Sequence, residues 1–147
     1  MRVTENQRRF MGSYLVSSFR FQVFGTQILE NEIIFKNKTM DKKIEKQKVL
    51  AVNDLIDYAD GGIVSKEFEH SEAGSITLFA FDAGQRLSEH KAPFDAVIQI
   101  IDGEAEIMID GSLYHPKAGE MIIIPKDALH AVNANMHFKM LLTMIRG

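Results

Sequence analysis

The sequence lacks cysteine and tryptophan altogether. Without cysteine there can be no disulfide, no thiolate metal ligand and no cysteine nucleophile, and this composition favours a reducing, cytoplasmic location. The net charge of -3 provides no broad basic field to attract a phosphate backbone, so nucleic acid is not expected as a partner. The chain also has no apolar run of membrane-spanning length, and no membrane partner is expected.

Charge is distributed unevenly along the 147 residues. Residues 1–39 contain six Lys or Arg and three Asp or Glu, whereas residues 40–147 contain eleven and seventeen. We expect residues 1–39 to be an N-terminal extension, either an added strand or arm or a stretch upstream of a true start at Met40, and we favour the second interpretation. The apolar run at 10–20 is interrupted by glycine, serine and arginine, unlike a secretory signal. Residues 40–147 are expected to form a single domain.

From Met40 onward the pattern is almost wholly β. Residues 53–58 predict one short helical turn with Asn53 as its cap. Branched or aromatic runs separated by turn residues predict strands at 63–68, 75–83, 94–101, 105–109, 112–114, 121–124 and 137–146. Asp110-Gly111 predicts a two-residue hairpin, because glycine accepts the positive φ of a type I′ turn. Many short strands at close spacing are typical of an all-β sandwich or barrel.

The expected strands at 94–101 and 137–146 are apolar on both faces. In the first of them, one face carries Ala96, Ile98 and Ile100, and the other carries Val97, Gln99 and Ile101. A barrel strand normally has one face in water, so we expect the outer face to be covered by a second copy of the chain or by the N-terminal extension. We predict a homodimer joined sheet to sheet.

Two histidines lie at matching places in two glycine-containing motifs. These are Gly84-Gln-Arg-Leu-Ser-Glu-His90, and Gly119-Glu-Met-Ile-Ile-Ile-Pro125 with His130 five residues later. This pattern resembles the paired motifs of the cupin superfamily, and the stretches at 87–96 and 138–146 are similar to those of small single-domain cupins of bacteria. The resemblance covers about residues 48–146. It implies an all-β, cupin-type jelly-roll β-barrel, also called a double-stranded β-helix or RmlC-like fold, whose two sheets enclose a pocket.

In the metal-binding members of that superfamily, the two motifs supply three histidines and a glutamate. The corresponding positions here are His90, Ala92, Ala96 and His130. Half of the set is therefore missing, and two imidazoles hold a divalent ion such as zinc, manganese, iron or nickel only weakly. A bulge at the start of the strand would turn Asp95 inward and complete a set of two histidines and one carboxylate.

Three functions are compatible with these residues. The first is a barrel that binds a small molecule in an apolar pocket anchored by His90 and His130, with Glu89 beside them. The second is a metal-dependent enzyme of the dioxygenase or isomerase type, in which the two histidines hold the ion and Glu89 or Asp95 assists. The third is a dimeric interaction module without a small-molecule ligand. The remaining histidines are expected to be surface or core residues: His70, His115 and His137.

Overall fold

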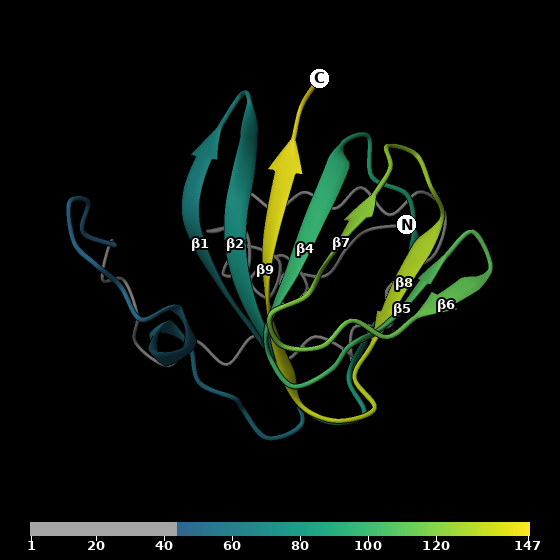
Figure 1. The fold of residues 1–147 in the computed structure, drawn as a ribbon, viewed down its shortest axis with the longest axis horizontal. Coiled ribbons are helices and arrows are strands. Elements are labelled where there is room, and N and C mark those ends of the chain that lie inside the picture. Colours follow the sequence, from purple (N-terminus) through teal and green to yellow (C-terminus); the bar gives the residue numbers. More distant parts are fainter. Residues whose placement is uncertain (1–43) are drawn as a thin grey trace, which may run out of the picture.

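The structure is a computed structural model, and it describes residues 44–147. In this range the chain forms one 3-10 turn and nine strands: η1 (Val52–Leu55), β1 (Ile63–Ser71), β2 (Gly74–Phe81), β3 (Arg86–His90), β4 (Asp95–Asp102), β5 (Glu106–Ile109), β6 (Ser112–Tyr114), β7 (Met121–Ile124), β8 (His130–Asn133) and β9 (Phe138–Ile145). The strands form two antiparallel sheets, in the orders β1-β2-β9-β4-β7 and β3-β8-β5-β6 (Figure 1). The predicted all-β jelly-roll class is confirmed.

The expectations for the start of the chain lie outside the described residues. They concern the extension at residues 1–39 and the alternative start at Met40. Among residues 44–147, no helix is long and apolar enough to cross a membrane.

The main core fills the space between the two sheets. Ile98 and Ile100 of β4 point into it, and so does Ile107 of β5 from the other sheet. The rings of Phe81 and Phe138 stack in it with centroids 4.6 Å apart. Each of these side chains is fully or almost fully buried, which stabilises the fold by about 1.5–3 kcal/mol per residue. The predicted alternation of β4 therefore places Ala96, Ile98 and Ile100 on the inner face.

The outer face of the five-stranded sheet is covered in part by residues 52–58. A second apolar cluster lies there, consisting of Ile56, Leu78 and Ala80 with Val52, Leu55, Tyr58, Val64, Phe68, Ile101 and Leu141 packed against it. The expected covers were a second copy of the chain or the extension at residues 1–39; the segment around η1, which is neither, covers part of this face.

Three polar side chains hold this segment on the sheet. The Tyr58 hydroxyl donates a hydrogen bond to Asp102 Oδ2 at 2.7 Å. Lys139 Nζ donates to the Asn53 carbonyl oxygen at 2.7 Å and lies 5.0 Å from the centroid of the Tyr58 ring. We call Tyr58, Asp102 and Lys139 the outer clasp. In the clasp, buried Lys139 has a carbonyl acceptor and an aromatic face to offset the loss of water.

The helical turn differs from its prediction. It spans Val52–Leu55, and the residue at its N-cap position is Ala51, which makes no side-chain cap. The prediction of Asn53 as cap was wrong, because this single turn is held by packing and by Lys139 rather than by a capping side chain. The predicted hairpin is confirmed, since Asp110 and Gly111 both have positive φ, 47° and 84°, and β5 pairs with β6 across them.

Candidate functional site

The two motif histidines lie on two strands that the sequence pattern did not predict. His90 is the last residue of β3, and His130 is the first residue of β8. Both strands are short and carry polar side chains, so they lack the branched or aromatic run that marks a strand in sequence. The register of β3 and β8 places His90 directly opposite His130.

This register brings the two imidazoles together inside the barrel. The exposed fractions of His90 and His130 are 8% and 5%, and their ring centroids lie 4.2 Å apart at an interplanar angle of 57°. Neighbouring side chains on paired strands normally lie within this reach. The structure therefore assembles the two predicted site residues into one buried pair.

The hydrogen bonds of the two rings determine which nitrogen carries the proton. His90 Nδ1 lies 2.7 Å from the Ser88 carbonyl oxygen, and His130 Nδ1 lies 2.9 Å from the Ala128 carbonyl oxygen. A carbonyl oxygen can only accept, so Nδ1 is the donor in each neutral ring and Nε2 is an acceptor. The same arrangement, with Nδ1 on a backbone carbonyl, orients the imidazole ligands of metal sites.

Burial favours the neutral form of His90. It lowers the pKa of His90 below the ordinary value of 6.5, and the neighbouring His130 lowers it further, whereas the bond to Ser88 acts in the opposite direction. At neutral pH the ring is therefore uncharged and presents an acceptor rather than a cation.

Two loops lead from the five-stranded sheet to the histidine pair, residues 91–94 and residues 125–129. One hydrogen bond connects them directly, from the Asp127 N–H to the Ala92 carbonyl oxygen at 2.8 Å. A second bond ties the loop 125–129 to the first residue of β4, because the Lys126 N–H donates to Asp95 Oδ1 at 2.8 Å. We call residues 91–94 and 125–129 the joined loops.

The remaining positions of the implied metal set hold no ligand. Ala92 and Ala96 are both buried, and Ala96 faces the interior. Asp95 is exposed, and its carboxylate is engaged with Lys126. No bulge turns Asp95 inward, since the pairing of β4 with β9 is regular from Asp95 to Ile100. Among the described residues, no group of three or more His, Asp or Glu side chains could hold a metal ion, so the complete site does not fit this chain.

Glu89 is not brought into the buried pair either. It precedes His90 on β3 and is exposed. Of the four predicted site residues, the structure joins His90 with His130 and places Glu89 and Asp95 at the surface.

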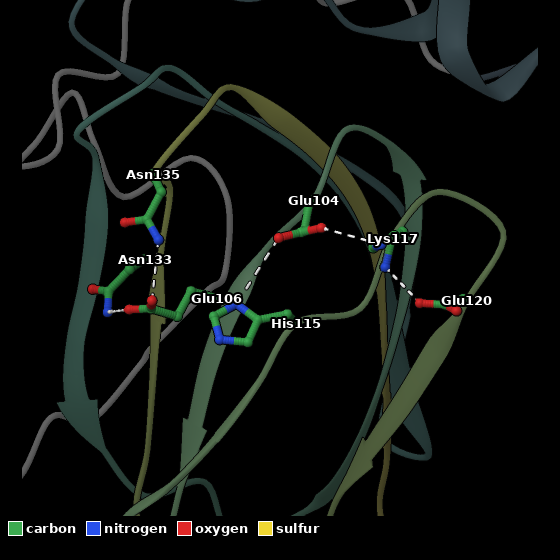
Figure 2. A network of polar contacts seen from close by, with 7 residues as sticks. All are labelled: Glu104, Glu106, His115, Lys117, Glu120, Asn133 and Asn135. Carbon is green, nitrogen blue, oxygen red and sulfur yellow. Dashed lines mark hydrogen bonds and ion pairs between the residues drawn. The ribbon is translucent and has the colours of Figure 1, made fainter.

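The other three histidines, His70, His115 and His137, each contact other residues instead of the buried pair. His115 lies 4.0 Å from Glu104 in an exposed network with Lys117 and Glu120 (Figure 2). Figure 2 also shows a second set of contacts, in which the half-buried Glu106 accepts hydrogen bonds from Asn133 and Asn135. Bonds from the two asparagines hold the pKa of Glu106 below its usual range. The ring of His137 lies 4.5 Å from that of Tyr58, and His70 Nδ1 lies 3.5 Å from Glu67 Oε2.

Sequence reasoning missed a second polar group on the inner face of the five-stranded sheet. Three buried oxygens there have no hydrogen-bond partner among the described residues: Glu67 Oε2, Ser75 Oγ and Thr77 Oγ1. We call these residues the inner cluster. A signal for it was available, because Ser75 and Thr77 continue the inward alternation of Phe79 and Phe81.

Comparison with protein families identifies the chain. The model of the family described as "Ethanolamine utilisation protein EutQ" matches residues 30–143. The chain belongs to the EutQ family. No curated protein matches this EutQ-family chain.

Solved structures similar to this EutQ-family chain confirm the cupin domain. A conserved protein of unknown function from Streptococcus pyogenes is 32% identical with a TM-score of 0.69, and the match covers 71% of this chain and 92% of that one. A cupin superfamily protein from Desulfitobacterium hafniense is 25% identical with a TM-score of 0.67, over 72% and 97%. The Clostridium difficile EutQ protein shares the fold at 19% identity and a TM-score of 0.51, over 56% and 67%.

Proposed function

We propose that this EutQ-family chain binds a small molecule in an apolar pocket of the barrel, with His90 and His130 as polar anchors. The observation that carries the proposal is the buried pair itself, two rings 4.2 Å apart with each Nδ1 oriented by a carbonyl. Ligand sites in proteins are mostly apolar and contain a few well-placed polar groups. An acceptor nitrogen on each ring suits a ligand that donates hydrogen bonds.

A screen of small molecules by thermal shift tests this proposal. Sugars, amino acids, amines, carboxylic acids and phenols are tested against the full chain, with and without divalent metal. A ligand at one hundred times its Kd stabilises the folded state by about 2.7 kcal/mol. His130→Ala should abolish the shift, whereas the matched control His115→Ala, in an exposed network, should retain it. A shift that survives both His90→Ala and His130→Ala would contradict the anchoring role.

Metal binding by the same pair is a separate question. Two imidazoles with oriented Nδ1 atoms could hold zinc, manganese, iron or nickel, but the described residues offer no third ligand, so we expect weak binding. A metal-dependent dioxygenase or isomerase would need at least one further ligand to hold its ion. Elemental analysis of the untagged protein and of its His90→Ala variant distinguishes weak binding from a metal-dependent enzyme. A stoichiometric metal content in the unmodified protein that is lost in the variant would favour the enzyme.

We propose in addition that the chain forms a homodimer in the cytoplasm. Met121 and Ile123 of β7 and Ile145 of β9 are more than half exposed on the outer face that residues 52–58 leave uncovered. Ile123→Lys should convert a dimer to a monomer in light scattering, whereas Leu113→Lys on β6, equally exposed, should not. A monomer mass for the unmodified chain would overturn the dimer. A dimer that responds to no ligand in the screen would support the interaction module instead.

A further inference from the structure

The inner cluster is an unusual feature of a barrel interior. Ser75 and Thr77 are exposed by only 5% and 2%, and neither hydroxyl has a hydrogen-bond partner among the described residues. Glu67 Oε2 is buried beside them and also has no hydrogen bond among the described residues, and the ionisable His70 has its Nδ1 3.5 Å away. Buried polar atoms are nearly always paired, with protein or with a bound molecule, because an unpaired group costs about 1–3 kcal/mol.

The strand register places the three oxygens together. Glu67 of β1 lies directly opposite Thr77 of β2, and Ser75 follows two residues away on the same face of β2. Side chains in such positions have Cβ atoms about 4.5–5.5 Å apart across the strands and about 7 Å apart along one strand. One small group can therefore contact all three.

The inner cluster lies at the same end of the barrel as the histidine pair. Ser75 is opposite Met144, Met144 is opposite Ala96, and Ala96 is opposite Ile124. This row crosses the sheet from the inner cluster to the strand ends where the joined loops begin and lead to His90 and His130. Figure 1 shows the β1–β2 turn and the C-terminal end of β9 at this end of the molecule.

Apolar side chains separate the two polar groups. Leu142 of β9 belongs to the inner core and lies opposite Thr77. Met144 packs against that core and lies between Ser75 of β2 and Ala96 of β4. The nearby ionisable side chains are His70, with Nδ1 3.5 Å from Glu67 Oε2, and Arg146, whose guanidinium lies 4.9 Å above the Phe94 ring. Neither donates a hydrogen bond to the two hydroxyls.

The three oxygens match one kind of ligand group. A primary ammonium has three hydrogen-bond donors and a positive charge, and the inner cluster presents three acceptor oxygens with a carboxylate among them. An alcohol has one donor and a carboxylate has none. We propose that Glu67, Ser75 and Thr77 bind the ammonium group of a small amine whose apolar part lies along Met144 and Leu142; this rests on the ligand-binding function proposed above.

The test uses n-pentylamine, with 1-pentanol and pentanoate as probes of the same chain length. Binding to the full chain at neutral pH is followed by NMR of the methionine methyl groups, with Met144 assigned through Met144→Leu. We expect pentylamine to shift the Met144 signal saturably and to bind about tenfold or more tightly than pentanol, since a hydrogen bond to a charged group is worth about 1.5–3 kcal/mol.

Isosteric variants connect this binding to the inner cluster. Thr77→Val and Glu67→Gln keep the side-chain shape and should each weaken pentylamine binding about tenfold. Thr143→Val makes the same change on the outer face of β9 and should leave the affinity unchanged. Ser75→Ala provides a second hydroxyl deletion if one variant folds poorly, and a denaturation curve is recorded for each.

Several outcomes would overturn the proposal. They are equal binding of amine and alcohol, preference for pentanoate, undiminished affinity in Thr77→Val and Glu67→Gln, or no shift with any probe. A failure of the inner-cluster proposal can be distinguished from a failure of the proposed function. If His130→Ala abolishes ligand binding and Thr77→Val leaves it intact, only the histidine anchors are supported. Amine binding lost in Thr77→Val and kept in His130→Ala would uphold the inner cluster alone.

Discussion

The two faces of the five-stranded sheet differ in whether their buried polar side chains form hydrogen bonds. On the outer face, Tyr58 and Lys139 of the outer clasp each donate a hydrogen bond of 2.7 Å. On the inner face, the buried hydroxyls of Ser75 and Thr77 in the inner cluster have no hydrogen-bond partner among residues 44–147. The first arrangement stabilises the fold, whereas the second costs free energy in the unliganded chain. The comparison therefore distinguishes the polar groups of the outer clasp, whose hydrogen bonds stabilise the fold, from those of the inner cluster, which we propose bind a ligand.

The largest effect should come from breaking the outer clasp. Tyr58→Phe removes the hydroxyl that donates to Asp102 and leaves that carboxylate unpaired. We expect the free energy of unfolding to fall by about 1.5 kcal/mol, the low end for hydrogen bonds to charged groups because the pair is only half-buried. Urea denaturation measures it. Tyr114→Phe, at an exposed tyrosine, should change stability by less than about 0.5 kcal/mol, and equal losses in both variants would contradict the role of the clasp.

The same kind of deletion on the inner face should have the opposite sign. Thr77→Val replaces an unpartnered hydroxyl with a methyl group of similar size, so the free energy of unfolding should rise by about 1 kcal/mol. Thr143→Val on the outer face is the matched control in the same urea experiment. A loss of stability in Thr77→Val would mean that the hydroxyl is satisfied in solution.

Acid should act on the barrel interior, through His90 of the four-stranded sheet, rather than on the outer clasp. His90 has a lowered pKa in the folded chain, so the unfolded chain binds the proton more readily and stability falls as pH decreases below about 6.5. Burial and the bond to Asp102 raise the pKa of Tyr58, so that tyrosine stays neutral throughout this range. Thermal midpoints between pH 8 and pH 5 should decrease toward acid, and His90→Gln should flatten the curve. An unchanged slope in that variant would assign the effect to other groups.

The exposed network of Figure 2 should show the smallest effect. Glu104 lies 4.0 Å from His115 and 3.9 Å from Lys117, and all three residues are exposed. Glu104→Gln should change the free energy of unfolding by less than about 0.5 kcal/mol, and added salt should reduce the difference further. A change as large as that of Tyr58→Phe would show that exposure alone does not predict the value of a polar contact in this fold.

Sequence reasoning succeeded where one local pattern determines the structure. Asp110-Gly111 predicted its hairpin through the φ angles that the turn requires, and the alternation around Ile98 predicted the inner face of β4. It failed where the local structure depends on pairing or contact with a segment far away in the sequence. β3 and β8 exist because they pair with each other and because β8 also pairs with β5. Asn53 does not cap the turn; its backbone carbonyl accepts a hydrogen bond from Lys139 instead.

The candidate site was predictable only in part, for the same reason. The motif spacing selected His90 and His130, but their ring orientation depends on the carbonyls of Ser88 and Ala128, which no side-chain pattern encodes. Asp95 could be placed only once the register of β4 was known. Its neighbour Ala96, not Asp95, occupies the inward position.

The joined loops have a mechanical consequence. Each loop adjoins one histidine. The Asp127 bond links the two loops, and the Lys126 bond links the second loop to Asp95 at the start of β4. The two imidazoles therefore cannot separate unless the loops also shift or these bonds break. Asp95, which does not face the histidine pair, instead ties the loop that ends at His130 to the start of β4 and so restrains the separation of the two rings.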